Sequence, residues 1–248
     1  MTVENYKRLI RLYVPELEFI PEKKCALSDK QAHYLKNVMR KTAGDALRVF
    51  NGRDGEWLAT IEESGKKKVL IGLSHKLLEQ KPGPDIWILA SPVKKEALDL
   101  MVEKACELGA ARFIPVICDH TVVHKINQER LQVIAIEAAE QSERLDIMTV
   151  EQLCILKNYL NSGNYNNYNR ELIFCLERAM TVPLVEVMGN LAGKPLAILI
   201  GPEGGFSTRE IEFIGNFEHA HPVSLGPRIL KTETALIAAL SCVQLYNS

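Results

Sequence analysis

The sequence predicts an α/β protein in which a mostly parallel sheet is covered by helices and preceded by a smaller β domain. In the larger part of the chain, short apolar runs alternate with helical patterns, as at residues 86–90 and 95–108. Such alternation is typical of a parallel sheet packed between helices. Near the N-terminus, short strand-like runs are separated by turns that contain glycine, which favours a small antiparallel barrel.

The N-terminal part contains four predicted strands and one short helix. The strands cover residues 11–14, 46–50, 56–61 and 68–73. Ser28 begins a Ser-Asp-Lys-Gln run that can cap a helix extending to about Met39. Residues 80–84, Gln-Lys-Pro-Gly-Pro, disfavour both helix and sheet ladder. We therefore place a boundary there, with residues 1–80 and 84–248 as the two domains.

The larger domain shows a repeated strand and helix pattern. Residues 95–108 place Leu98, Met101 and Val102 on one helical face, and Gly109 follows as a stop. Further strands are expected at 113–118, 172–176 and 196–200, and a further helix at 127–144. Residues 158–169 are almost entirely Asn, Tyr, Ser and Gly, which predicts an exposed loop.

The composition is that of a globular protein with a substantial core. Of 248 residues, 47% are hydrophobic and 25% charged, which excludes bulk disorder and a small disulfide-dependent fold. No run of about 18 apolar residues occurs, and residues 1–13 lack the pattern of a signal peptide, so we expect no membrane association. The six cysteines are widely spaced and typical of reduced thiols, which predicts a cytoplasmic protein.

A metal site is not expected. His120 and His124 have the i, i+4 spacing of a metal-binding pair, but no third ligand accompanies them.

The charges are distributed unevenly along the chain. Residues 1–82 carry 16 Lys and Arg against 11 Asp and Glu, a net charge of +5. Residues 83–248 carry 14 against 20, a net of −6, and the two parts sum to −1. The basic part is suited to face phosphates, although scattered surface charge gives the same count.

Two glycine-containing loops carry the chemical signal. The first follows an apolar strand as Gly201-Pro202-Glu203-Gly204-Gly205-Phe206, and Ser207 and Glu210 then form a capping box for the next helix. It matches neither the Walker loop nor the dinucleotide-binding Gly-x-Gly-x-x-Gly. The second, Gly226-Pro227-Arg228-Ile229-Leu230-Lys231, follows a strand at 221–225. Loops at the carboxyl ends of parallel strands are where such sheets bind ligands, although a tight turn alone also uses glycines.

The residue pattern of the last helix predicts that the protein forms a dimer. From Thr232 its apolar residues surround the helix axis, as Ala235, Leu236, Ile237, Ala238 and Leu240 illustrate. A helix that is apolar all round is buried on every side. At the end of the chain that burial calls for a second subunit, so we expect a homodimer with the glycine loops beside the dimer interface.

Residues 200–207 and 225–235, read as Ile-Gly-Pro-Glu-Gly-Gly-Phe-Ser and Leu-Gly-Pro-Arg-Ile-Leu-Lys-Thr-Glu-Thr-Ala, resemble the signature of the RsmE family. Residues 104–109, 140–144 and the pattern His33-x-x-x-Val38-Met39-Arg40 extend the resemblance over essentially the whole chain. Members are SPOUT-class methyltransferases that act on the N3 atom of a uridine in 16S ribosomal RNA. The sequence departs from the family at Met39, at Glu143 and at His120-Thr121, where Arg-Ser is frequent.

The resemblance implies an N-terminal PUA-like RNA-binding barrel and a C-terminal SPOUT domain whose chain end forms a trefoil knot. It further implies a homodimer that binds S-adenosylmethionine and 16S rRNA. The implied cofactor-binding residues all lie in or beside the two glycine loops. They are Leu199, Ile200, Gly201, Glu203, Gly204, Gly205, Leu225, Gly226, Arg228, Ile229, Leu230 and Thr234.

Methylation of uridine N3 requires that the proton on this atom leaves as the methyl group arrives. Arg228 and Lys231 are candidates for a cation that stabilises the uridine anion. Besides Asp146 and Glu143, which stay open as alternatives, Glu203 and Glu233 are the candidates for the base. Each also has a structural interpretation, since Glu233 can stabilise a helix N-terminus and Glu203 can accept hydrogen bonds from loop amides.

The predicted RNA-binding residues are basic side chains, mostly in the first domain. His33 and Arg40 lie seven residues apart, two helical turns, and would share one helix face, although His33 can equally be a helix-packing residue. The full set is Arg8, Arg11, His33, Lys36, Arg40, Lys94 and Arg144.

Two alternative functions remain open at this level. One is a SPOUT methyltransferase for another rRNA or tRNA site, and the other is a non-catalytic RNA-binding factor in ribosome assembly. The residues identify neither the base, nor the target nucleotide, nor whether the substrate is naked rRNA or an assembled subunit.

Overall fold

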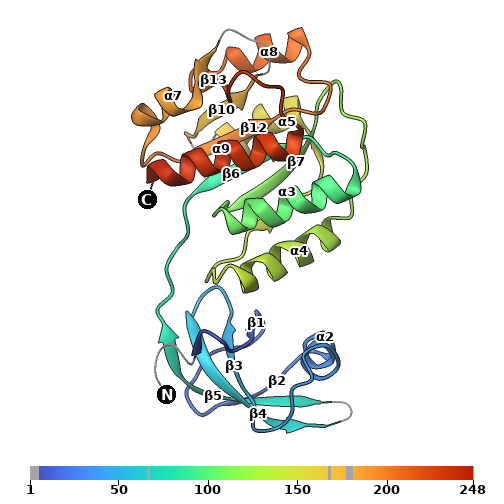
Figure 1. Cartoon of the computed structure of the whole chain (residues 1–248), viewed down its shortest axis with the longest axis vertical. Coiled ribbons are helices and arrows are strands. Elements are labelled where there is room, and N and C mark those ends of the chain that lie inside the picture. Colours follow the sequence, from blue (N-terminus) through green and yellow to red (C-terminus); the bar gives the residue numbers. More distant parts are fainter. Residues whose placement is uncertain (1–5, 66–67, 167–168, 177–180, 248) are drawn as a thin grey trace. The chain divides into compact units, whose positions relative to one another are not determined.

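The computed structural model describes residues 6–65, 68–166, 169–176 and 181–247. The chain forms two compact units (Figure 1). Unit 1 comprises residues 1–82 together with 139–147, and unit 2 comprises 83–138 together with 148–248. In the described part of the chain, no helix combines the length and the apolar character that crossing a bilayer requires.

Unit 1 contains a five-stranded sheet. Its strands are β1 (Arg11–Tyr13), β2 (Lys24–Ala26), β3 (Ala46–Phe50), β4 (Glu56–Ser64) and β5 (Val69–Leu78), in the order β1-β3-β4-β5-β2. Three of the four pairings are antiparallel, whereas β1 pairs with β3 in parallel. The sequence did not indicate β2, because Lys-Cys-Ala contains none of the β-branched or aromatic residues that favour strands.

The predicted helix after Ser28 is confirmed, in two pieces. α2 (Asp29–His33) begins with a capping box between Ser28 and Gln31, and the π-helix η1 (Tyr34–Val38) continues it. Ala32 and Leu35 point into a core formed with sheet residues such as Leu47, Val49 and Ile71.

Unit 2 contains a parallel sheet in the order β11-β13-β10-β12-β6-β7-β8, with β9 paired to β7. All of these pairings are parallel, as the strand and helix alternation predicted. The strands are β6 (Ile86–Ala90), β7 (Arg112–Ile117), β8 (Thr149–Val150), β9 (Cys154–Ile155), β10 (Glu171–Cys175), β11 (Val182–Pro183), β12 (Leu196–Ile200) and β13 (Ala220–Ser224).

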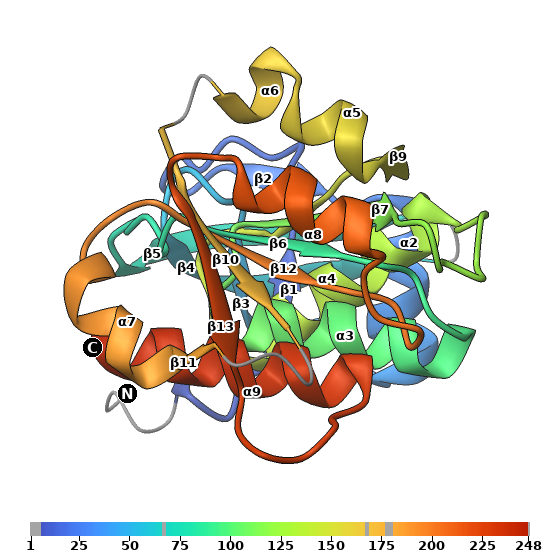
Figure 2. The same cartoon turned by 90° about the horizontal axis from the view of Figure 1, so that it is seen from above.

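Helices cover both faces of this sheet (Figure 2). On one side lie α3 (Lys95–Glu107), α7 (Leu184–Leu191) and α9 (Thr232–Asn247), and α9 packs against the other two. On the other side lie α5 (Leu156–Leu160), α6 (Gly163–Asn166) and α8 (Thr208–Gly215). The remaining helix, α4 (Gln128–Gln141), begins in unit 2, and its last residues belong to unit 1. Because both faces are covered, β6 and β12 are buried along their whole length.

The prediction of an exposed loop at 158–169 is wrong for most of the segment. Its described residues form part of α5 and all of α6, and Tyr159, Leu160 and Tyr165 are buried in the core beneath the sheet. The polar composition concealed three large side chains that anchor the segment. Residues 167–168 lie outside the described part of the chain.

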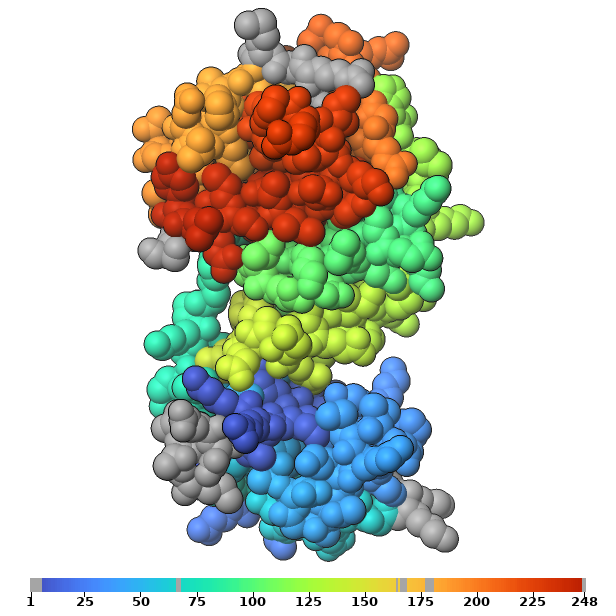
Figure 3. Space-filling view, viewed as in Figure 1, coloured from blue at the N-terminus to red at the C-terminus, as the bar shows by residue number. Residues whose placement is uncertain are grey.

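α9 is less enclosed within one chain than the sequence suggested. Leu236, Ala239, Leu240 and Val243 are fully buried, because they face α3 and the sheet. The other side of the helix is open: in the space-filling view α9 lies at the surface beside α3 (Figure 3). At its end Leu245 is 78% exposed, so an apolar surface remains available for a second subunit.

Candidate functional site

The two glycine loops lie at the same edge of the parallel sheet. β12 leads into the first loop and β13 into the second, and β10 lies between these strands in the sheet. Because the strands are parallel, their carboxyl ends meet at one edge, where open α/β sheets bind their ligands. Residues 177–180, which follow β10, are not described.

The first loop has a turn that depends on glycine. Gly205 has φ +70° and donates its N–H to the carbonyl oxygen of Pro202 at 2.8 Å. A Cβ at Gly204 would lie 3.1 Å from Cβ of His120, so the loop backbone passes close to the β7–α4 segment. The predicted capping box is confirmed, since the hydroxyl of Ser207 accepts from the N–H of Glu210 and the Glu210 carboxylate accepts from the N–H of Ser207.

The second loop also turns at a glycine, and the residue that follows it contacts the first loop. Gly226 has φ +108°, a conformation that favours glycine, and its N–H donates to the hydroxyl of Ser224 at 3.1 Å. At the start of α9, the hydroxyl of Thr232 donates to the carbonyl oxygen of Gly201 at 3.4 Å. This bond brings the end of the second loop to the beginning of the first.

The structure adds a third segment that the sequence interpretation missed, residues 118–121 after β7. The N–H of Asp119 donates to Glu210 Oε1 at 2.9 Å, and Ser207 Oγ donates to Asp119 Oδ2. The ring of His120 contacts the carbonyl oxygens of Gly204 and Gly205. In the sequence, His120 stands out only by its spacing to His124 and as a departure from the family pattern. Residues 118–127 are not helical, so the i, i+4 spacing does not place those two histidines on one helix face.

A buried hydroxyl pair supports this third segment. Ser91, directly after β6, and Thr121 have their hydroxyl oxygens 2.7 Å apart, and Thr121 Oγ1 also accepts from the N–H of Cys118. Ser91 further donates its N–H to the carbonyl oxygen of Ile200. Burial raises the pKa of the Cys118 thiol, so this cysteine stays protonated and is a structural residue rather than a nucleophile.

The predicted cofactor-binding residues fall into two groups. Leu199 and Ile200 have fully buried side chains in the sheet core, so only their backbone groups can face a ligand. The others surround the open edge. Their side chains or glycine backbones are exposed or half-buried: Gly201, Glu203, Gly204, Gly205, Leu225, Gly226, Arg228, Ile229, Leu230 and Thr234.

The catalytic candidates lie on the two loops or directly after the second one. Glu203 and Arg228 are exposed, whereas Glu233 is half-buried in the first turn of α9. The position of Glu233 suits an acidic residue at a helix N-terminus as well as a base.

The predicted RNA-binding residues separate by exposure. Arg8, His33 and Arg40 of unit 1 are exposed and Lys36 is half-buried, while Lys94 of unit 2 is exposed before α3. Arg40 has φ +52° and therefore ends the η1 segment in a left-handed turn, so it does not continue one helix face with His33 as the spacing suggested.

Arg11 does not belong with this exposed set. It is 5% exposed, and its guanidinium pairs with the buried carboxylate of Glu56. It also donates to the carbonyl oxygens of Ala139, Glu140 and Arg144 within unit 1. The Arg144 side chain is itself only 9% exposed and pairs with Asp146. Both guanidinium groups already have partners, the buried carboxylate of Glu56 for Arg11 and the half-buried carboxylate of Asp146 for Arg144, and this favours a structural role for both arginines. Sequence alone could not show this, since burial depends on the sheet register.

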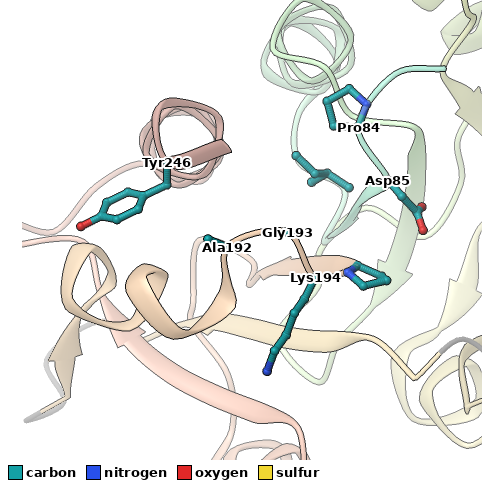
Figure 4. A pocket seen from close by; sticks show the side chains of 8 residues that line it. Pro84, Asp85, Ala192, Gly193, Lys194 and Tyr246 are labelled. Carbon is teal, nitrogen blue, oxygen red and sulfur yellow. The ribbon is translucent and has the colours of Figure 1, made fainter. Parts of the chain in front are cut away.

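A described cavity lies away from the glycine loops. It has a volume of about 590 Å³ and lies where β6 and β12 begin, between Asp85, Lys194 and Tyr246 (Figure 4). Asp85 is paired with Arg170, and Lys194 with Glu171. The cavity is therefore at the amino ends of the strands, the edge opposite to the loops.

Family models match both parts of the chain. Residues 79–244 match an RNA methyltransferase domain, and residues 27–74 match an RNA methyltransferase PUA domain. The chain is 34% identical to the ribosomal RNA small subunit methyltransferase E of Rickettsia conorii over 221 residues, which cover 89% of each protein. It is 29% identical to the Bacillus subtilis protein of the same name, over 88% of each chain.

Solved structures give the same result. A methyltransferase of Legionella pneumophila in complex with S-adenosylmethionine (SAM) is 31% identical, with a TM-score of 0.82 over 97% of this chain and 98% of that one. The ribosomal RNA small subunit methyltransferase E of Neisseria gonorrhoeae, bound to SAM, is 26% identical, with a TM-score of 0.83 over 97% and 98%.

The parallel sheet with its paired glycine loops, joined to a PUA-type β domain, defines the class of RNA methyltransferases with a PUA domain. Within that class, the chain belongs to the ribosomal RNA small subunit methyltransferase E (RsmE) family.

Proposed function

We propose that the protein transfers a methyl group from SAM to the N3 atom of a specific uridine in 16S rRNA. The observation that carries this proposal is the pair of family-specific loops, which converge at the carboxyl edge of the sheet through the Thr232–Gly201 hydrogen bond. The RsmE protein of Neisseria gonorrhoeae, solved with SAM bound, shares this fold over almost the whole chain.

The loops suit SAM in two respects. Gly205 and Gly226 have open space where a Cβ would stand, so backbone groups can approach a ligand closely. Ile229, a large apolar side chain, is 57% exposed on the second loop, and a bound adenine would cover such a surface. The site therefore offers backbone donors and acceptors beside an apolar wall. Leu199 to Gly205 and Leu225 to Leu230, with Thr234, would hold the cofactor.

SAM supplies an electrophilic methyl group when it is bound. The protein must position the uridine base outside its stack, so that N3 is accessible, and must assist the loss of its proton. Arg228, exposed on the second loop, would stabilise the negative charge on the uridine carbonyl oxygens. Glu203 or Glu233 would accept the N3 proton.

We further propose that the enzyme acts in the cytoplasm as a homodimer through the open side of α9, where Leu245 and Tyr246 are exposed. A trefoil knot at the chain end would be compatible with the strand order. β13 pairs with β10 on the side away from β12. The chain then returns as α9, which packs against β12 and α3.

RNA binding would involve unit 1, the PUA-like part, through Arg8, His33, Lys36 and Arg40, and unit 2 through Lys94. Lys36 already donates to the carbonyl oxygen of Gly65, an exposed contact that a phosphate can replace at small cost. Phosphate contacts of this kind give affinity but no sequence preference, so the target uridine would be selected elsewhere.

The direct test is methylation of defined substrates. The purified protein is incubated with SAM and 16S rRNA, either naked or in small ribosomal subunits, from a strain without this activity, and the nucleosides are analysed by mass spectrometry. We expect N3-methyluridine at one position. The large-subunit rRNA and the tRNA of the same strain are tested in parallel, and a methyl group on either of them instead of on 16S rRNA would support the alternative methyltransferase. Failure to bind SAM by calorimetric titration would leave only a non-catalytic RNA-binding role.

A further inference from the structure

Residues 118–121 are joined to the first glycine loop and to the start of α8 by hydrogen bonds across more than 80 positions of sequence. Asp119 is bonded twice, through its N–H to Glu210 and through its carboxylate to Ser207. His120 Nδ1 lies 3.2 Å from the carbonyl oxygen of Gly204 and 3.1 Å from that of Gly205. The bonds at Asp119 hold the beginning of the helix, and those at His120 hold the glycines themselves.

The partners of His120 determine which ring nitrogen carries hydrogen. Both are carbonyl oxygens, which only accept hydrogen bonds, so Nδ1 must be the donor. In the neutral ring Nε2 is then the nitrogen without a proton. The contact therefore needs one N–H group at the Nδ1 position and does not need a positive charge.

The segment that carries His120 is anchored by a buried pair of hydroxyl groups. Thr121 is 6% exposed, and its hydroxyl lies 2.7 Å from that of Ser91, which in turn donates its N–H to the carbonyl oxygen at the end of β12. The ring thus extends from the ends of β6 and β7 to the loop after β12. Close packing accompanies the bonds, since a Cβ on Gly204 would lie 3.1 Å from Cβ of His120.

We propose that His120 is a positioning residue for the SAM-binding loop: its Nδ1–H fixes the carbonyl groups of Gly204 and Gly205 in the orientation that the cofactor needs. The inference rests on the proposed function of that loop. Two carbonyl groups held before the ligand arrives lower the entropy cost of binding. Without the N–H, the glycine loop would sample more conformations, and SAM would bind the competent one with lower apparent affinity.

The test compares three variants of the full-length protein. His120→Ala removes the donor. His120→Asn keeps an N–H group at nearly the Nδ1 position, because the asparagine amide nitrogen is the same number of bonds from the backbone. His124→Ala removes an exposed histidine from the same segment and serves as the control. Calorimetric titration with SAM gives the affinity, and thermal unfolding shows whether each variant is folded.

We expect His120→Ala to weaken SAM binding about tenfold, the size of one lost hydrogen bond between backbone and side chain. His120→Asn should restore most of the affinity, and His124→Ala should match the wild type. In the methylation assay, His120→Ala should raise KM for SAM more than it lowers kcat.

A second measurement does not need the cofactor. The N–H of Gly205 is bonded to Pro202, so its hydrogen exchange reports on the order of the loop. Exchange should be faster in His120→Ala and near wild type in His120→Asn. If the wild type binds SAM and His120→Ala binds it equally well with unchanged Gly205 exchange, the inference is wrong. If the wild type itself does not bind SAM, the proposed function fails instead.

Discussion

The substitution Glu56→Gln tests the buried ion cluster of unit 1. Glu56 is 2% exposed and pairs with both Arg11 and Arg48, which are each 5% exposed. Arg48 has a second partner in the more exposed Glu143. The change keeps the size of the side chain and removes the buried negative charge between Arg11 and Arg48, so two buried guanidinium groups face a neutral amide.

The expected loss of stability follows from these contacts. Removing one partner of a buried ion pair costs about 3–5 kcal/mol, because the remaining charge stays desolvated. The lower end applies here, since Arg11 keeps its bonds to three carbonyl oxygens and the glutamine oxygen can still accept. A loss of about 3 kcal/mol corresponds to a decrease in Tm of roughly 6–12 °C in a protein of this size.

Circular dichroism during heating measures the effect. Glu18→Gln is the matched control, because Glu18 forms an exposed pair with Lys23, for which about 0–1 kcal/mol is expected. A Tm for Glu56→Gln within the range of the Glu18→Gln variant would refute the reasoning. It would mean that the buried charge of Glu56 contributes little to the stability of unit 1.

Three further predictions concern the loops and the surface of unit 1. Gly204→Val should reduce SAM affinity at least about tenfold, because the added atoms meet His120, and near-normal affinity in a calorimetric titration would show that the loop does not bind the cofactor. Arg40→Ala should weaken RNA binding and reduce the slope of log affinity against log salt concentration by about one, while the affinity for SAM stays unchanged. An unaltered slope in a filter-binding assay would show that Arg40 does not contact RNA phosphates. The hydrogen bond from Arg48 lowers the pKa of Glu143. The Arg48–Glu143 pair therefore stabilises the folded state fully at a pH above the ordinary pKa of glutamate, near 4.3, and this stabilisation is lost as the pH falls through the lowered pKa. The Tm difference between wild type and Glu143→Gln should accordingly shrink on acidification from about pH 6 to pH 3, and a constant difference would show that the pair does not contribute.

Much of the fold was predictable because local patterns repeat in it. Apolar runs such as Leu196–Ile200, followed by helical patterns, predicted the parallel sheet, and Ser28 and Ser207 marked the helix starts that the structure contains. The failures occurred where few residues carry the signal. The strand Lys24–Ala26 contains no β-branched or aromatic residue, and the buried Tyr159 and Tyr165 stand in an otherwise polar segment.

The candidate site was also predictable only in part. The sequence by itself identified the two glycine loops and the basic first part of the chain, because glycine requirements, capping residues and charge are properties of neighbouring residues. Only the tertiary structure decided which distant groups meet. It brought Asp119 and His120 to the first loop, and it buried Arg11 against Glu56 and thereby removed it from the RNA-binding set. Contacts across 45 to 91 positions depend on strand order and register, which no local pattern encodes.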